Sequence, residues 1–145
     1  MNRVKHLSGK TVAVDSAPLI YFVEHHPDYY KSVQPFFAAL DNGGLKALTS
    51  AVTVAEALVH PLRHGRADLV EVYDELFANY LPAVPVTTEI ARLAAKLRAE
   101  HNFRTPDALE LATAVIHQAD FFLTNDTRLA RFNLLAVLVI SDLTD

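Results

Sequence analysis

Short apolar segments alternate along this chain with longer segments of helical periodicity. The apolar segments show little polar alternation, so each would be buried on both faces, which is typical of strands in a parallel sheet. They are Thr11–Val14, Leu45–Thr49, Ala83–Val86, Phe121–Thr124 and Leu135–Ile140. Strands that alternate with helices in this way predict an α/β fold with a mostly parallel sheet of about five strands.

The segments between these strands predict helices, several of which stop at glycine or proline. They are Ala17–Glu24, Pro27–Leu40, Ala51–His64, Ala67–Tyr80, Thr88–His101, Pro106–Gln118 and Thr127–Phe132. Ser16 and Thr105 are predicted N-caps, because a side-chain oxygen there accepts a hydrogen bond from a free N–H group of the first turn. Pro61 is predicted to kink or end its helix.

Length and composition narrow the class of protein. We expect a single domain over residues 1–145, since this is about one domain's length and no linker divides it. With 51% hydrophobic residues, the chain has enough apolar surface for a core. The sequence has no cysteine, which excludes disulfides, thiol catalysis and zinc–thiolate sites.

The N-terminal segment and the net charge bear on location and partners. Residues 1–10 carry Arg3, Lys5 and Lys10 but lack the apolar core of a signal peptide, and we expect them to form a flexible basic extension. No apolar run reaches the roughly 18 residues that suggest a membrane span, so we expect a cytoplasmic protein with no membrane segment. The net charge of −4 argues against nucleic-acid binding through general charge alone.

Four carboxylates lie where a parallel sheet would bring them to one edge. Asp15 and Asp126 follow predicted strands, and Glu56 and Asp107 lie near the starts of predicted helices. In such sheets the site lies beyond the carboxyl ends of the strands. Clustered carboxylates need positive charge to coexist, which predicts a site for a hard divalent cation. Each acid alone also has an ordinary explanation, such as a favourable interaction of Asp107 with a helix dipole.

The order and local context of these acids resemble the PIN-domain ribonucleases, and among them the VapC-type toxins of toxin–antitoxin pairs. The most specific motifs are Thr-Pro-Asp-Ala-Leu-Glu-Leu-Ala (105–112) and Leu-Thr-Asn-Asp (123–126), and the similarity spans residues 11–140. The resemblance implies a three-layer α/β/α fold. It also implies that Asp15, Glu56, Asp107 and Asp126 are both catalytic and metal-binding, and that Mg²⁺ or Mn²⁺ supports hydrolysis of RNA phosphodiesters. A cognate antitoxin and a homodimer are further implications.

Neighbouring polar residues are candidates for substrate binding. Ser16 resembles the small hydroxyl residue that often follows the first family aspartate, although a plain N-cap explains it equally well. Thr124 and Asn125 would orient Asp126 or contact phosphate, or else serve only the turn. Arg104 would guide RNA phosphates, or would face solvent with the other basic residues of its set, which are Arg92, Lys96 and Arg98. In this family, aromatic helical segments such as residues 29–37 contribute to antitoxin and dimer contacts.

Three other functions and a zinc site fit parts of the sequence less well than the nuclease or stay open beside it. A PIN fold that holds RNA or protein without cutting is disfavoured by the intact acids, and a nuclease of RNA maturation that is not a toxin stays open. A phosphorylated receiver domain requires paired acids at its first strand and a late lysine, but no lysine follows Lys96. His60 and His64 have the spacing of a helical zinc pair, but Pro61 disturbs that geometry and no third ligand is evident.

Overall fold

The sheet has the parallel architecture predicted from the sequence. The computed structural model describes residues 3–143, and within them one five-stranded sheet has the order β3-β2-β1-β4-β5, with every pair of neighbours parallel. The strands are β1 (Thr11–Val14), β2 (Lys46–Ser50), β3 (Ala83–Val84), β4 (Phe121–Thr124) and β5 (Ala136–Val139). β1 therefore occupies the centre, where both of its neighbours contribute residues to the same edge.

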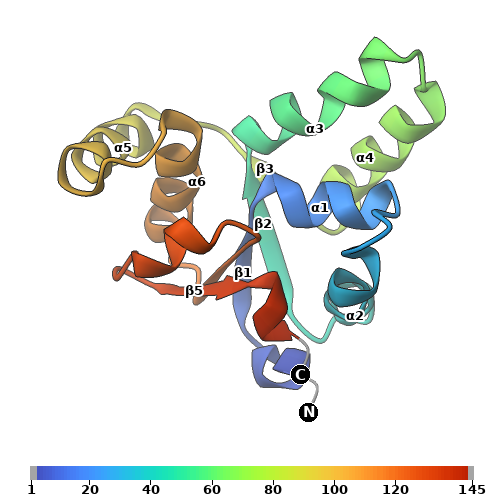
Figure 1. Cartoon of the computed structure of the whole chain (residues 1–145), viewed down its shortest axis with the longest axis horizontal. Coiled ribbons are helices and arrows are strands. Elements are labelled where there is room, and N and C mark those ends of the chain that lie inside the picture. Colours follow the sequence, from blue (N-terminus) through green and yellow to red (C-terminus); the bar gives the residue numbers. More distant parts are fainter. Residues whose placement is uncertain (1–2, 144–145) are drawn as a thin grey trace.

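Helices cover both faces of this sheet, which confirms the three-layer α/β/α arrangement (Figure 1). One face carries α1 (Ser16–Val23), α2 (Tyr30–Asp41), α3 (Ala51–Arg63) and α4 (Ala67–Asn79), and the other carries α5 (Thr88–His101) and α6 (Thr105–Ile116). Three 3₁₀ helices complete residues 3–143, namely η1 (Arg3–Leu7), η2 (Thr127–Arg131) and η3 (Ile140–Leu143). None of the helices in this range has the length and apolarity that a membrane crossing requires.

Alternating side chains of the central strands divide the core into two clusters. Val12 and Val14 of β1 pack in the cluster on the α1–α4 side, while Ala13 between them packs with α5 and α6. In β4, Leu123 likewise packs on the α1–α4 side, and Phe122 packs with α5 and α6. Complete burial of a side chain such as Phe122 contributes roughly 1.5–3 kcal/mol. The apolar composition of these strands thus follows from their burial on both faces.

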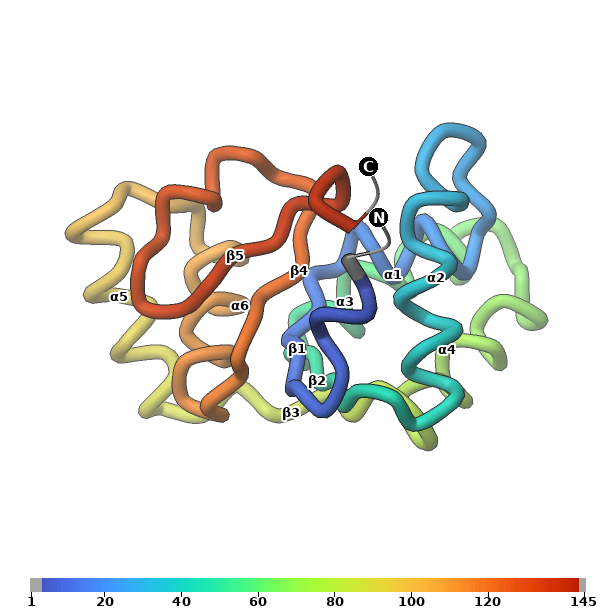
Figure 2. The backbone as a smooth tube through the Cα atoms, turned by 90° about the horizontal axis from the view of Figure 1, so that it is seen from below, coloured from blue at the N-terminus to red at the C-terminus, as the bar shows by residue number. Residues whose placement is uncertain are grey.

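The segment at residues 3–10 is packed against the domain, in contrast to the flexible extension expected there. η1 contacts α2 and η3, and Val4 and Leu7 are buried in the cluster on the α1–α4 side. The backbone N–H of Gly9 donates to the carbonyl of Gly44, at 2.9 Å. Figure 2 shows this segment beside β1 and β2. Its apolar residues explain the difference, because Val4 and Leu7 gain from burial while Lys5 and Lys10 stay exposed to water.

The observed helices differ from the predicted ones at two places that have a clear local cause. α3 continues past Pro61 to Arg63, so Pro61 does not end the helix; its ring is buried. The second helix begins at Tyr30 and not at Pro27. The reason lies in the preceding turn, where the His26 ring accepts hydrogen bonds from the backbone N–H groups of Asp28 and Tyr29 and holds them outside the helix.

The predicted N-caps at Ser16 and Thr105 are also wrong. Asp15 caps α1, with Ser16 as its first helical residue, and Arg104 occupies the cap position of α6 without a side-chain hydrogen bond. A carboxylate accepts backbone N–H groups as well as a hydroxyl does, so Asp15 takes the role at the strand end. Thr105 falls within the first turn of α6, one residue before Pro106.

Candidate active site

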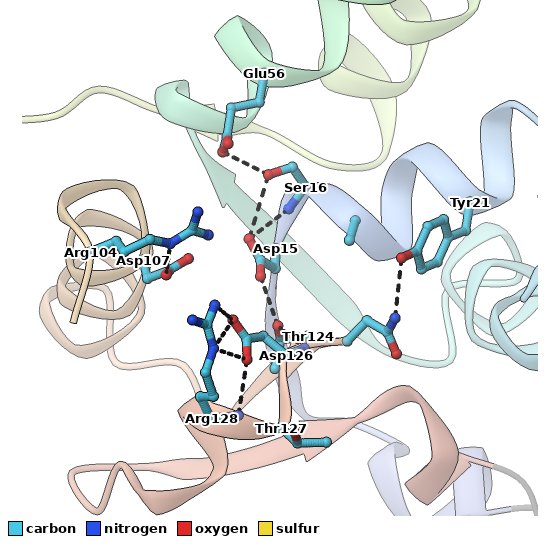
Figure 3. A pocket seen from close by; sticks show the side chains of 12 residues that line it. Asp15, Ser16, Tyr21, Glu56, Arg104, Asp107, Thr124, Asp126, Thr127 and Arg128 are labelled. Carbon is cyan, nitrogen blue, oxygen red and sulfur yellow. Dashed lines mark hydrogen bonds and ion pairs between the residues drawn. The ribbon is translucent and has the colours of Figure 1, made fainter.

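The four predicted acids line one pocket at the carboxyl edge of the sheet (Figure 3). Asp15 follows β1, Asp126 follows β4 as the N-cap of η2, and the other two come from helices that begin at this edge. Glu56 lies in the second turn of α3, and Asp107 lies in the first turn of α6. The pocket has a volume of about 460 Å³. The structure thus brings together residues that are distant in sequence.

Asp15 is buried and held from two sides. Its Oδ1 accepts a hydrogen bond from the Ser16 backbone N–H at 2.8 Å, and its Oδ2 accepts one from the Thr124 hydroxyl at 2.8 Å. Burial raises the pKa of Asp15 to about 6; these hydrogen bonds oppose the rise, and the charges of Asp107 and Glu56 add to it. The carboxyl group is therefore ionised at neutral pH but lies close to its titration range.

Ser16 links the first acid to the second. Its hydroxyl donates to Oε1 of Glu56 at 2.8 Å and lies 3.5 Å from Oδ1 of Asp15. Because Ser16 is the first residue of α1 and Glu56 belongs to α3, this bond fixes one helix against the other at the pocket. The role of Ser16 in this structure is therefore to orient Glu56, while the cap belongs to Asp15.

Arginines pair with the other two acids. Nε of Arg104 lies 3.1 Å from Oδ2 of Asp107. Arg128 makes a two-pronged contact with Asp126, with Nη2 at 2.6 Å from Oδ2 and Nε at 2.9 Å from Oδ1. The Arg128 contact lowers the pKa of Asp126. Both arginine side chains remain about two-thirds exposed (67%), so these pairs lie open to the pocket and to solvent.

The charges of the pocket balance only in part. The two arginines offset Asp107 and Asp126, whereas Asp15 and Glu56 take part in none of the ion pairs found among residues 3–143. Two carboxylates on neighbouring helices and strands repel each other unless a cation or a proton intervenes. A divalent cation would supply the missing charge next to Asp15.

The donor set fits a hard cation that keeps much of its water. All candidate ligands are carboxylate oxygens, which Mg²⁺ prefers. Within residues 3–143, however, no three acidic or histidine side chains approach closely enough to form a metal-binding group. Mg²⁺ commonly binds through one or two carboxylates and several waters, and the pocket is large enough for such a hydrated ion. The pocket therefore fits the cation, with fewer direct ligands than the full quartet.

A model of the PIN domain matches residues 12–135 of the chain. The chain belongs to the PIN domain family. No curated protein matches it in sequence. The matched range includes all four pocket acids, the strands β2, β3 and β4, and β1 from its second residue, while β5 follows the range directly.

Solved structures with this PIN fold include toxin–antitoxin proteins. VapBC2 from Rickettsia felis, bound to a DNA fragment of its promoter, has a TM-score of 0.69 and 16% identity, covering 89% of this chain and 98% of the other. A toxin–antitoxin complex from Klebsiella pneumoniae has a TM-score of 0.71 and 19% identity, covering 90% and 98%. The sarcin–ricin-loop-cleaving toxin VapC20 of Mycobacterium tuberculosis has a TM-score of 0.64 and 14% identity, covering 77% and 86%. At these identities the likeness concerns the fold.

Thr124 and Asn125 have separate roles in this PIN domain. The Thr124 hydroxyl donates to Asp15 and accepts from the backbone N–H of Asp126 at 3.0 Å, so it orients two acids at once. The Asn125 amide donates to the Tyr21 hydroxyl at 3.1 Å and joins β4 to α1. Both residues line the pocket.

Of the basic set predicted near the site, only Arg104 lines the pocket. Arg98 donates to the carbonyl of Phe103 at 3.0 Å, and Lys96 pairs with Glu100 on the surface of α5. The alternative zinc pair also fails, because Nδ1 of His60 lies 2.9 Å from Glu24 and the described residues contain no metal-binding group with His60 and His64.

Sequence reasoning missed two residues at or near the pocket. Arg128 lies two positions after Asp126, within reach of that acid in the same turn, and this spacing was the available signal. Glu110 lies three positions after Asp107 on α6, so both side chains project from one helical face. Glu110 is only 2% exposed, and burial raises its pKa well above the ordinary value, with the Asp15 charge as the next cause.

Proposed function

We propose that this PIN domain is an endoribonuclease that hydrolyses RNA phosphodiesters with Mg²⁺ or Mn²⁺, and that it is the toxin of a VapBC-type pair. The observation that carries the proposal is one pocket with four carboxylates and two open arginines at the carboxyl edge of the sheet. Acids of this kind hold a cation, and arginines hold phosphate. Membership of the PIN domain family supports the same activity.

The residues divide into cation-holding and orienting groups. Asp15 and Asp107 would be the main cation ligands, Asp126 would complete the site, and Glu56 would act on the cation or on the attacking water. A cation held there would lower the pKa of a bound water and would stabilise charge on the phosphate and on the leaving oxygen. Thr124 holds Oδ2 of Asp15, and the Ser16 hydroxyl holds Oε1 of Glu56, so both acids keep fixed orientations.

Arg104 and Arg128 are the groups that we assign to the RNA backbone. Each guanidinium is paired with an acid on one side and exposed on the other. A cation shared by the acids would weaken these pairs, and the guanidinium groups would then bind phosphate oxygens in the two-pronged geometry that arginine favours.

Arg128→Gln should raise KM for RNA about tenfold, because a hydrogen bond to a charged group contributes roughly 1.5–3 kcal/mol. The melting temperature should change little, since an exposed ion pair contributes at most about 1 kcal/mol. Initial cleavage rates at a series of RNA concentrations give KM. Arg92→Gln on the exposed surface of α5 is the matched control, and an equal KM in the two variants would remove Arg128 from the substrate site.

The test of the proposed function is cleavage of total RNA by the purified protein, with Mg²⁺ or Mn²⁺ and with EDTA. We expect discrete fragments that appear only with the cation and that identify the class of RNA cut. RNA binding without fragments would instead favour the non-cleaving module, and cleavage that leaves cells unharmed would favour an RNA-maturation nuclease.

The antitoxin and dimer contacts are proposed for the face formed by α1–α4. A groove of about 280 Å³ lies between α1, α2 and α4 and is lined by apolar and aromatic side chains, including Phe22, Tyr30, Phe37, Leu76 and Tyr80. Val59 and Leu62 of α3 and Val72 of α4 are exposed on neighbouring helices.

Sedimentation of the pure protein tests the homodimer. For the antitoxin contact, Tyr80→Ala should weaken inhibition of cleavage by a co-expressed antitoxin. Both partners meet in the cytoplasm under this proposal.

A further inference from the structure

A chain of buried polar contacts lies directly beneath the pocket. Oε1 of Glu110 lies 2.7 Å from the Thr53 hydroxyl oxygen, which lies 2.9 Å from the Thr49 hydroxyl oxygen, and Thr49 lies 2.6 Å from the carbonyl oxygen of Val14. The side chains of Thr49, Thr53 and Glu110 are at most 2% exposed. The chain therefore links α6, α3, β2 and β1 within the core.

Counting protons along this chain determines its direction. The Val14 carbonyl oxygen can only accept a hydrogen bond, so the Thr49 hydroxyl must use its single proton to donate to it. In the contact between the two threonines, the Thr53 hydroxyl must then be the donor and the Thr49 oxygen the acceptor. The remaining contact, between Thr53 and Glu110, has no hydroxyl proton left and requires one on the carboxyl group. Three consecutive hydrogen bonds therefore exist only if Glu110 is a neutral acid that donates to Thr53.

The members of this chain lie next to the pocket acids in sequence. Val14 directly precedes Asp15, Thr53 lies one turn before Glu56, and Glu110 lies one turn after Asp107. Any shift of α3 or α6 relative to β1 would break a buried hydrogen bond, and an unpaired buried polar group is strongly disfavoured. This series of hydrogen bonds thus resists changes in the spacing of the three elements that carry Asp15, Glu56 and Asp107.

We propose that Glu110 is a positioning residue that is held as the neutral acid and fixes α6 and α3 against β1 beneath the pocket. In this form it adds no fifth negative charge to a pocket that already holds more acid than base. Its effect on cleavage rests on the proposed nuclease function, whereas its protonation follows from the hydrogen-bond chain alone.

The protonation is tested by infrared spectroscopy of the metal-free protein at pH 7. The difference spectrum between wild type and Glu110→Gln should contain the carbonyl stretch of a protonated carboxylic acid, lost in the variant. Asp15 is present in both proteins, so its titration cancels. A difference spectrum with only the bands of an ionised carboxylate would overturn the proposal.

The effect of Mn²⁺ on the melting temperature tests whether Glu110 adds a negative charge near the pocket. Glu110→Gln has the same neutral charge and offers an amide N–H to Thr53, so the rise in melting temperature caused by Mn²⁺ should equal that of wild type. If Glu110 were ionised, the substitution would remove a negative charge near the cation and weaken the rise. That result would also contradict the neutral acid.

The positioning role is tested by comparing Glu110→Gln with Glu110→Leu and Thr53→Val. The glutamine variant should keep kcat and KM, while both apolar variants should lose kcat with little change in KM for RNA. The rescue by glutamine separates positioning from simple filling of the core, because leucine also fills it. Equal kcat in all three variants would overturn the positioning role. Failure of the wild type to cut RNA would instead contradict the nuclease, and the infrared spectrum would still decide the protonation.

Discussion

Asp107→Asn should keep the fold and reduce metal-dependent RNA cleavage by at least about a hundredfold. Asparagine has nearly the same shape as aspartate but lacks the charge that holds a cation. Asp107 is 8% exposed in the first turn of α6, and its Oδ2 lies 3.1 Å from Nε of Arg104, so the substitution acts on a buried charge that faces the pocket. Cleavage of total RNA at saturating Mn²⁺ measures the loss.

The matched control for this prediction is Asp74→Asn. Asp74 lies on the exposed surface of α4, outside the pocket, and the same chemical change there should leave the cleavage rate within error of wild type. Thermal melts of both variants establish that they are folded. A cleavage rate in Asp107→Asn equal to that of the control would show that this acid does not hold the catalytic cation.

The second large effect concerns the stability of the metal-free protein, which should fall as pH rises from about 4 to 6. The pKa of Asp15 in the folded state is about 6, above the roughly 3.9 of an aspartate in an unfolded chain. The folded state therefore binds more protons in this window. The stability that Asp15 contributes is fully present below the pKa of the unfolded chain and is lost as pH rises through the pKa of the folded state. The loss is about 3 kcal/mol for a shift of two pKa units.

Asp15→Asn should abolish this part of the pH dependence. Urea unfolding of both proteins at a series of pH values measures the difference in free energy of unfolding. Asp126 contributes with the opposite sign, since its pKa is lowered by Arg128, but its contribution is common to both proteins. Parallel pH profiles for wild type and variant would contradict the raised pKa of Asp15.

Mn²⁺ or Mg²⁺ should reverse the loss at neutral pH by binding to the ionised acid. A cation at about a hundred times its Kd stabilises the folded state by about 2.7 kcal/mol, which corresponds to a rise in melting temperature of roughly 5–10 °C for a chain of this size. The rise should be smaller at pH 5, where Asp15 is protonated. Asp15→Asn should weaken the rise at pH 7, and an unaffected rise would show that Asp15 is not a ligand.

The elements and the acids of the pocket were predictable from local patterns. Burial on both faces requires β1 and β4 to be apolar throughout, so their composition indicates parallel strands directly. Asp15 and Asp126 follow those strands, and parallel strands place their carboxyl ends at one edge, so proximity in the pocket followed from the fold class. Local signals were less accurate in two places: Pro61 does not end α3, and α2 begins at Tyr30 because the hydrogen bonds of His26 hold the preceding residues outside the helix.

The states of Asp15 and Glu110, in contrast, depend on contacts between residues that are distant in sequence. Thr124 holds Asp15 across 109 positions, and Thr53 meets Glu110 across 57. Burial is the main cause of the raised pKa of Asp15, and it also raises the pKa of Glu110 above that of an ordinary surface glutamate.

The sequence by itself determined the α/β class, the PIN resemblance and the identity of four pocket acids, because these rest on periodicity and order along the chain. Only the tertiary structure decided that Asp15 and Glu56 remain without an arginine partner, that Thr124 holds Asp15, and that a buried series of hydrogen bonds ends at Glu110. Burial and hydrogen bonding are properties of packed neighbours, and a linear pattern does not specify which neighbours meet.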